Sequence, residues 1–286
     1  MKINELYRFV LKNLKEENIE TPDIEARELI CNVLDFTPAE LYVKGDCDVS
    51  DEDAETISSH CERRISGEPL QYIIGKWDFM GRTFNVGPGV LIPRPETELL
   101  CEKVIECLKN KSNPLVYDLC AGSGCIGITL LKECPDVYLF LVEKSQEAIY
   151  YLNKNVDTHL KNTFLVVTHG NIFDKKAFEN HPEADVIVSN PPYIKSSEIS
   201  TLQKEVTFEP AMALDGGEDG LDFYRNIIYN WKQRLKPDGE FFFEIGEDQG
   251  QAVCTMLEDI GFNSKIIKDY NNHDRIVMGR KAPYVD

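Results

Sequence analysis

Residues 116–127 read Val116-Tyr117-Asp118-Leu119-Cys120-Ala121-Gly122-Ser123-Gly124-Cys125-Ile126-Gly127. The apolar run at the start is typical of a buried strand, the small residues form a turn, and a helix begins after them. Glycines let the backbone of a turn approach a ligand, and the first turn of a helix offers unpaired N–H groups. The stretch therefore predicts one strand–turn–helix unit of an α/β fold, with a ligand at the turn.

The rest of the chain after Pro114 repeats this alternation of strand and helix. We predict strands over 115–119, 137–142, 164–168, 185–189, 240–245, 264–268 and 275–279, and helices over 124–133, 145–156, 219–235 and 248–260. Alternation of this kind predicts a mostly parallel sheet covered on both faces. The last two strands are close enough to form an antiparallel hairpin. The expected fold is a seven-stranded, mostly parallel, Rossmann-like sheet.

The chain before this sheet divides into two further segments. Residues 1–70 carry helical periodicity and helix-start signals at Thr21-Pro22, Thr37-Pro38 and Ser50. They hold 17 Asp+Glu against 8 Lys+Arg, a net charge of −9. We predict a small acidic helical domain, which either docks a substrate or only covers one side of the larger domain. Residues 71–95 contain strand-like segments at 72–75 and 83–86, which predict a hairpin linker, and 96–286 form the main domain.

The amino-acid composition limits the classes of partner that this protein is expected to bind. The whole chain has 31 Lys+Arg and 49 Asp+Glu, a net charge of −18. This disfavours a surface that binds a phosphate backbone and suits a basic protein partner, although such a charge can also serve solubility alone. Nine cysteines without CxxC spacing and five scattered histidines indicate no disulfide framework and no metal site. The start lacks a signal-peptide core, and no apolar run could span a membrane, so we expect a cytoplasmic protein.

A second motif, Ser189-Asn190-Pro191-Pro192-Tyr193, follows the predicted strand 185–189. Polar side chains at the carboxyl end of such a strand face the crevice where open α/β sheets bind ligands. Each proline keeps the residue before it out of the helical region, so the backbone is extended. We predict that Asn190 and the Pro191 carbonyl are acceptors for a substrate NH2 group. The alternative is that Asn190 only caps a turn.

Two acids indicate which ligand the glycine turn binds. Gly122, Gly124 and Gly127 formally match a dinucleotide pattern, but the Asp118 carboxylate before the turn would repel a pyrophosphate. Glu143 ends the second predicted strand, where an acid binds ribose hydroxyls. An adenosine with a cationic tail fits both acids, because its ribose suits Glu143 and its positive charge suits Asp118. This combination points to S-adenosylmethionine.

These features resemble the class I S-adenosylmethionine-dependent methyltransferases that act on planar NH2 groups. Further stretches, over 67–75, 91–98 and 215–221, closely resemble the release factor glutamine-N5 methyltransferases. The resemblance covers essentially the whole chain, including the helical segment at its start. The Asn-Pro-Pro-Tyr motif alone does not choose the substrate, because DNA adenine methyltransferases share it.

The resemblance implies methylation of the glutamine side-chain amide in the Gly-Gly-Gln loop of peptide chain release factors, a step linked to translation termination. We expect a monomer that does not bind nucleic acid directly. The resemblance also implies cofactor contacts at Asp118, Cys120, Ala121, Gly122, Ser123, Gly124, Glu143, Asn171, Ile172 and Asn190. The substrate would meet Asn190, Pro191, Pro192 and Tyr193, of which Asn190, Pro191 and Tyr193 are the expected catalytic residues. Asn171 stands where the family often has an Asp that meets the adenine amino group.

Two other functions are compatible with parts of the sequence. A DNA adenine-N6 methyltransferase would share the site chemistry, but the charge of −18 and the lack of a visible basic recognition segment disfavour it. A catalytically silent module that binds release factors would be expected to have a damaged cofactor turn or to lack Asn190, and the sequence shows neither change.

Overall fold

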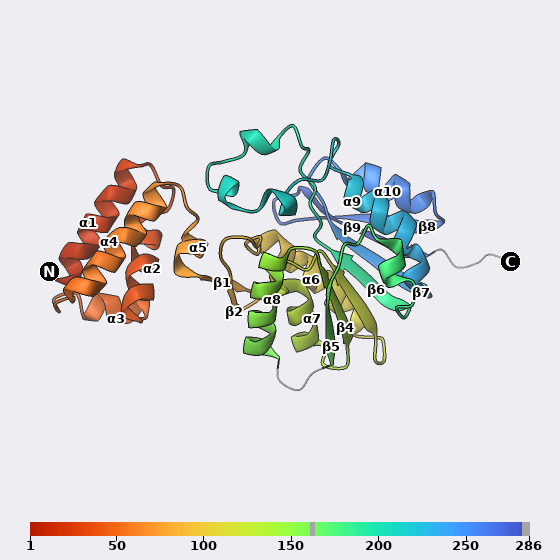
Figure 1. Ribbon diagram of the computed structural model, residues 1–286, viewed down its shortest axis with the longest axis horizontal. Coiled ribbons are helices and arrows are strands. Elements are labelled where there is room, and N and C mark those ends of the chain that lie inside the picture. Colours follow the sequence, from red (N-terminus) through yellow and green to blue (C-terminus); the bar gives the residue numbers. More distant parts are fainter. Residues whose placement is uncertain (161–163, 282–286) are drawn as a thin grey trace. The chain divides into compact units, whose positions relative to one another are not determined.

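The computed structural model describes residues 1–160 and 164–281, which form two compact units (Figure 1). The first comprises Met1–Trp77 together with Gln203–Phe208, and the second comprises Asp78–Leu202 and the chain from Glu209 onward. Residues 161–163 and 282–286, which the sequence assigns to the main domain, lie outside the described residues.

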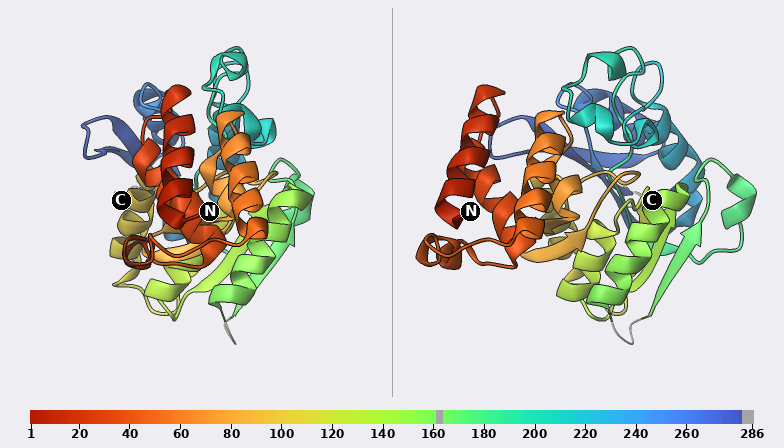
Figure 2. Two further views of the ribbon diagram at one scale, coloured as in Figure 1. Left: turned by 90° about the vertical axis from the view of Figure 1, so that its left-hand side faces the viewer. Right: turned by 60° about the vertical axis from the view of Figure 1, so that its left-hand side comes forward.

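The first unit is a helical bundle. Its helices are α1 (Ile3–Glu16), α2 (Pro22–Leu34), α3 (Pro38–Val43), α4 (Asp51–Ile65) and α5 (Leu70–Ile74). Helices α1, α2 and α4 pack against one another around an apolar core (Figure 2). Thr37 and Ser50 cap their helices as the sequence predicts, because their hydroxyl oxygens accept the N–H of Glu40 and Asp53. Thr21 holds the cap position of α2, but its side chain makes no capping hydrogen bond.

The predicted strand over 72–75 is wrong, because these residues belong to helix α5 and the glycine that ends it. Short apolar runs do not distinguish helix from strand by periodicity alone. Pro69 before the helix and Gly75 after it, with a φ of 77°, are boundary residues typical of a helix. The hairpin is therefore shorter than predicted and consists of β1 (Lys76–Phe79) and β2 (Arg82–Asn85).

The second unit contains the predicted seven-stranded sheet. In spatial order its strands are β5 (Leu165–His169), β4 (Tyr138–Glu143), β3 (Leu115–Leu119), β6 (Ala184–Ser189), β7 (Leu235–Glu244), β9 (Asp274–Lys281) and β8 (Phe262–Lys268). The first five run parallel, β9 is antiparallel to β7, and β8 is antiparallel to β9. This confirms the mostly parallel, Rossmann-like sheet and its terminal hairpin.

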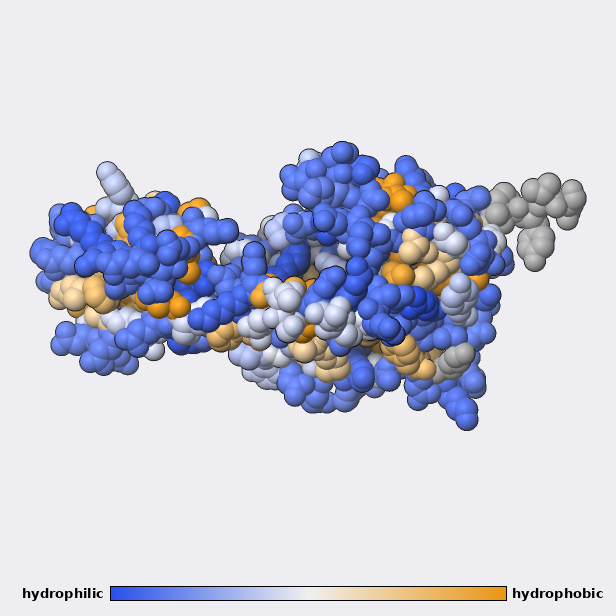
Figure 3. Space-filling model, turned by 90° about the horizontal axis from the view of Figure 1, so that it is seen from above, coloured by the Kyte–Doolittle hydropathy of each residue, from blue (hydrophilic) through white to orange (hydrophobic). Residues whose placement is uncertain are grey.

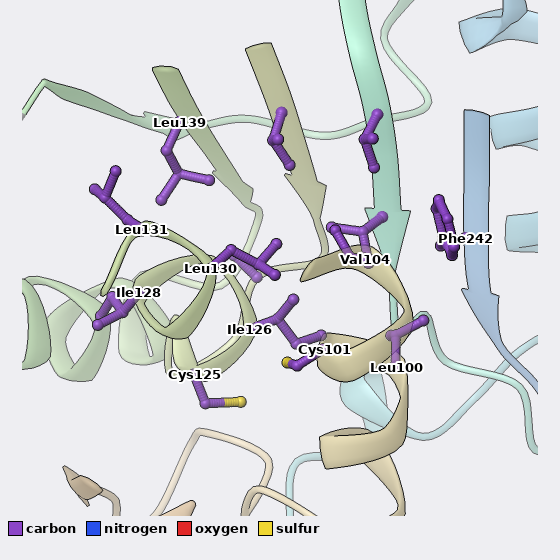
Figure 4. Close-up of a cluster of buried hydrophobic side chains, with 14 of the residues drawn as sticks. Leu100, Cys101, Val104, Cys125, Ile126, Ile128, Leu130, Leu131, Leu139 and Phe242 are labelled. Carbon is purple, nitrogen blue, oxygen red and sulfur yellow. The ribbon is translucent and has the colours of Figure 1, made fainter. Parts of the chain in front are cut away.

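Helices cover both faces of this sheet because alternate strand residues point to opposite sides. Val186 and Val188 enter one apolar core, whereas Ile187 enters the other. The first core packs against α6 (Pro95–Leu108), α7 (Cys125–Glu133) and α8 (Gln146–His159). Figure 4 shows Val104 of α6 and Leu130 of α7 within it. The second core packs against α9 (Asp222–Asn226) and α10 (Gly250–Glu258).

The predicted helix over 219–235 is only partly α-helical. After α9, Ile227–Trp231 form a π-helical turn and Lys232–Arg234 a 3₁₀ turn. A π turn brings side chains five residues apart onto one side, which an α-helix does not. As a result Asn226 Nδ2 and Trp231 Nε1 both donate to the Ile172 carbonyl, at 3.0 and 3.1 Å. The irregular helix thus fixes the segment after β5.

The face in Figure 3 is mostly hydrophilic, with apolar residues in small groups. All nine cysteines are free thiols. Among the described residues, no helix combines the length and the apolar character needed to cross a bilayer.

Candidate active site

A cavity of about 970 Å³, including its open mouth, lies at the carboxyl ends of β3, β4 and β6. The sheet order reverses between β3 and β6, and this switch point is where open α/β sheets bind ligands. The cavity lies within the second unit. Of the residues predicted to form the site, those that line it are Cys120, Ala121, Gly122, Ser123, Glu143, Asn171, Ile172, Asn190 and Pro192.

The backbone of the glycine turn is left-handed at three positions, two of which are glycines that adopt this conformation without strain. Cys120, Gly122 and Gly124 all have positive φ angles, of 62°, 54° and 79°. The Glu143 carboxylate accepts the Gly122 N–H at 2.8 Å and two further backbone N–H groups, from Lys144 and Ser145. Glu143 is therefore held rigidly beside the turn, where it lines the cavity.

Asp118 lies beneath the turn and does not line the cavity. Its Oδ2 accepts the Gly127 N–H at 2.9 Å, whereas Oδ1 has no hydrogen-bond partner among the described residues. Burial raises the pKa of Asp118 to about 7; the Gly127 hydrogen bond opposes this rise, and the charge of Glu143 adds to it. A Cβ on Gly127 would lie 2.3 Å from a Leu141 methyl carbon, so this glycine permits the close packing of α7 on the sheet.

The far wall of the cavity is apolar. It is lined by Val142, Ile172, Phe173 and Phe223. The rings of Phe173 and Phe223 pack edge to face, with their centroids 5.2 Å apart. Asn171 also lines the cavity, and its Oδ1 accepts the Phe173 N–H at 3.1 Å. Its predicted contact with adenine stays a prediction.

Asn190 reaches the cavity from the end of β6. Its Nδ2 donates to the Thr97 hydroxyl oxygen at 3.2 Å. Pro191, Tyr193 and Gly124, which the sequence predicted as a cofactor contact, lie outside the cavity lining. The Tyr193 side chain packs beside the second apolar core, and its burial raises the pKa of the phenol to about 12, so this group stays neutral at physiological pH.

Some lining residues were not among the predicted site residues. Thr97 belongs to the first turn of α6, and Met212 and Ala213 come from the long connection after β6. Arg94 lines the cavity and also pairs with Glu209. No local pattern links Thr97 to Asn190, because they are 93 residues apart in the sequence.

The loop over 215–220 supports the Asn-Pro-Pro-Tyr backbone. Gly216 N–H donates to the Ile194 carbonyl at 2.8 Å, and a Cβ on Gly216 would lie 2.7 Å from Tyr193 Cα. Gly220 has a φ of 77°, and its Cβ would lie 2.4 Å from the Tyr193 carbonyl oxygen. Both glycines therefore permit a contact between two backbones that a side chain would prevent.

Replacing Gly220 with alanine should lower the free energy of unfolding by roughly 3 kcal/mol, because a positive φ and a backbone overlap both oppose a Cβ. Urea unfolding measures this loss. Gly261→Ala is the matched control, since Gly261 has a φ of 83° but nothing within 4 Å of its Cβ position. It should cost about 1 kcal/mol. Equal losses in the two variants would show that the contact with Tyr193 is unimportant.

The fold and the cavity at its switch point place the second unit among the Rossmann-like methyltransferases. The family model "Methyltransferase small domain" matches residues 97–218, and "PrmC N-terminal domain" matches residues 5–75. The fold is also similar to that of a methyltransferase from Pyrococcus furiosus, with a TM-score of 0.55 and 16% identity over 79% of this chain and 100% of that chain.

The chain belongs to the release factor glutamine methyltransferase family, which confirms the resemblance found in its sequence. A release factor glutamine methyltransferase from Thermodesulfovibrio yellowstonii is 44% identical over 264 residues, covering 90% of this chain and 92% of the relative. One from Clostridium acetobutylicum is 36% identical over 280 residues, covering 97% and 98%.

Proposed function

We propose that this enzyme transfers a methyl group from S-adenosylmethionine to the side-chain amide nitrogen of the glutamine in the Gly-Gly-Gln loop of a peptide chain release factor. The names of its relatives favour this function over DNA methylation and over a silent binding module. The observation that carries the proposal is the Asn190 amide, held at the wall of the cavity by Thr97.

The lining of the cavity suits S-adenosylmethionine in its chemistry. Glu143 offers an acceptor to ribose hydroxyls, and the wall of Ile172 and Phe173 suits an adenine ring. The cofactor supplies an electrophilic methyl group on its sulfonium.

The protein's part in the reaction is to position and stabilise a weak nucleophile. The lone pair of an amide nitrogen is delocalised into its carbonyl. Two acceptors, Asn190 Oδ1 and the Pro191 carbonyl, would bind the two hydrogens, orient the nitrogen and stabilise the positive charge that develops on it. Within the described residues no hydrogen bond to the Pro191 carbonyl occurs. A strong base is not needed, because the methylated nitrogen is acidic.

Mass spectrometry of the Gly-Gly-Gln peptide tests this proposal. The purified enzyme, S-adenosylmethionine and a release factor should give a peptide heavier by one methyl group, with the modification on the glutamine. A release factor whose loop glutamine is replaced by glutamate is the control and should stay unmodified. An unmodified glutamine after incubation with the wild-type enzyme, or methylation of adenine in a DNA duplex, would contradict it.

We further propose that the acidic helical segment 1–70 docks the release factor, on the basis of its charge of −9. Glu17, Glu20 and Glu55 are exposed on this segment. Replacing all three with lysine should raise KM for the release factor by about tenfold, since each exposed charge contributes on the order of 0.5 kcal/mol. Steady-state kinetics should show little change in KM for S-adenosylmethionine. Equal changes in both constants would contradict docking.

A further inference from the structure

A buried glutamine binds both ends of the long connection that follows the Asn-Pro-Pro-Tyr turn. Gln249 directly precedes α10, and it is 5% exposed. Its Nε2 donates to the Tyr193 carbonyl at 2.9 Å and to the Gly220 carbonyl at 3.2 Å. Tyr193 is the last residue of the turn, and Gly220 lies just before α9. One side-chain NH2 group therefore joins the start and the end of this connection.

The acceptor end of the same amide fixes its orientation. Gln249 Oε1 accepts the Gly246 N–H at 2.9 Å, and the backbone N–H of Gln249 donates to the Gly246 carbonyl at 3.0 Å. Rotated by half a turn, the side chain would place its oxygen against two carbonyl oxygens and its NH2 group against an N–H. Both ends of the amide are thus matched to backbone groups, which neither a carboxylate nor an apolar side chain could achieve.

We propose that Gln249 is a positioning residue that holds the Asn-Pro-Pro-Tyr turn in the conformation needed for methyl transfer. This inference rests on the proposed function, in which Asn190 Oδ1 and the Pro191 carbonyl accept the two hydrogens of the substrate amide. Since no described residue donates a hydrogen bond to the Pro191 carbonyl, the direction of this carbonyl depends on how the backbone is held on either side of it.

The turn is held at two points. At its start, Ser189 ends β6, and its hydroxyl donates to the Leu119 carbonyl at 2.6 Å. At its end, Gln249 binds the Tyr193 carbonyl. The rings of the two prolines between these points fix their φ angles at about −65°. Few backbone torsions remain free, so the two anchors together determine where the Pro191 carbonyl points.

A second buried amide has the same bonding pattern and provides a matched control. Asn155 on α8 is fully buried, and its Nδ2 donates to the carbonyls of Asn85 and Ser123 at 3.1 and 2.9 Å. Its Oδ1 accepts the Asn85 N–H at 2.7 Å. Like Gln249, it binds two backbone carbonyls and a backbone N–H. In the described part of the chain, none of its hydrogen bonds reaches the Asn-Pro-Pro-Tyr turn.

Apolar substitutions of similar shape separate positioning from stability. Gln249→Met should lower kcat for the release factor by about tenfold, because a small displacement of the acceptors spoils the alignment of the reacting atoms. Asn155→Leu leaves the same kinds of backbone group unbound and should lose similar stability in urea unfolding, but it should keep kcat at saturating S-adenosylmethionine. Since Ser123 lines the cavity, an effect of Asn155→Leu on catalysis should be confined to the Kd for the cofactor.

Gln249→Glu is a second test that keeps both the shape of the side chain and its bond to Gly246. Its carboxylate would face two carbonyl oxygens in place of the NH2 group, so kcat should fall further, by about 10²-fold. Circular dichroism confirms that each variant is folded. A folded Gln249→Glu enzyme with wild-type kcat would overturn the positioning role, even if Gln249→Met does not fold.

A double-mutant cycle tests whether Gln249 acts through the turn. In the Asn190→Ala background Gln249→Met should have a smaller effect on the single-turnover rate, because one of the two acceptors that it positions is already gone. Fully independent effects, or a Gln249→Met enzyme as fast as wild type, would overturn the inference and leave the proposed function intact. A wild-type enzyme that left the glutamine unmodified in the same series would instead overturn the proposed function.

Discussion

The Asn190→Ala variant should lose about 10³-fold in kcat while it stays folded. Removing one preorganised polar group that stabilises charge in a transition state typically costs 10²–10³-fold, and here the same group also orients the nucleophile. The fold should survive because Asn190 is only half-buried and its one side-chain hydrogen bond in the described residues is the contact with Thr97. Single-turnover methylation of a release factor measures the rate, and a thermal melt checks the fold.

Asn171→Ala is the matched comparison for this prediction. Asn171 lines the same cavity, but its side-chain oxygen is bound to the Phe173 N–H. Its loss should weaken binding of S-adenosylmethionine more than it slows methyl transfer. Calorimetric titration with the cofactor separates the two effects. An Asn190→Ala enzyme that keeps more than about a tenth of the wild-type rate would show that the amide is not an essential acceptor.

The sheet and the strand-end residues could be predicted because the local pattern and the topology agree. Buried strands such as β6 contain a continuous apolar run, here 186–188, and parallel strands bring their carboxyl ends to one edge. The glycine turn, Glu143, Asn171 and Asn190 all follow such strands, so they line one cavity.

Other features depend on contacts that no local pattern contains. Thr97 meets Asn190 across 93 residues, and the π-helical turn at 227–231 is fixed by the Ile172 carbonyl, which lies on a different segment. The sequence predicted a strand in place of helix α5 because β-branched residues such as Ile73 and Ile74 favour strands. The proline and glycine at the ends of α5, together with its packing against α2, favour a helix instead. Tertiary contacts decided each of these cases.

The Arg64→Ala variant should lose about 3–5 kcal/mol of stability in the helical unit, because removing one partner of a buried ion pair leaves the other charge uncompensated. The Arg64 side chain is 4% exposed and Glu25 is 10% exposed. Arg64 Nη2 contacts Glu25 Oε1 at 3.2 Å and Glu205 Oε1 at 2.6 Å. Its loss would therefore leave Glu25 buried without its cation and remove the ion pair with Glu205.

Urea unfolding followed by circular dichroism measures this loss, and the neighbouring arginine provides the control. Arg63 also pairs with a glutamate, Glu68, but its side chain is 40% exposed, so Arg63→Ala should cost about 1 kcal/mol or less. Replacing Arg64 by methionine together with Glu25 by leucine should recover much of the stability, because an apolar pair needs no compensation. If this double variant were as unstable as Arg64→Ala, the loss would come from packing of the arginine stem and not from the unpaired charge.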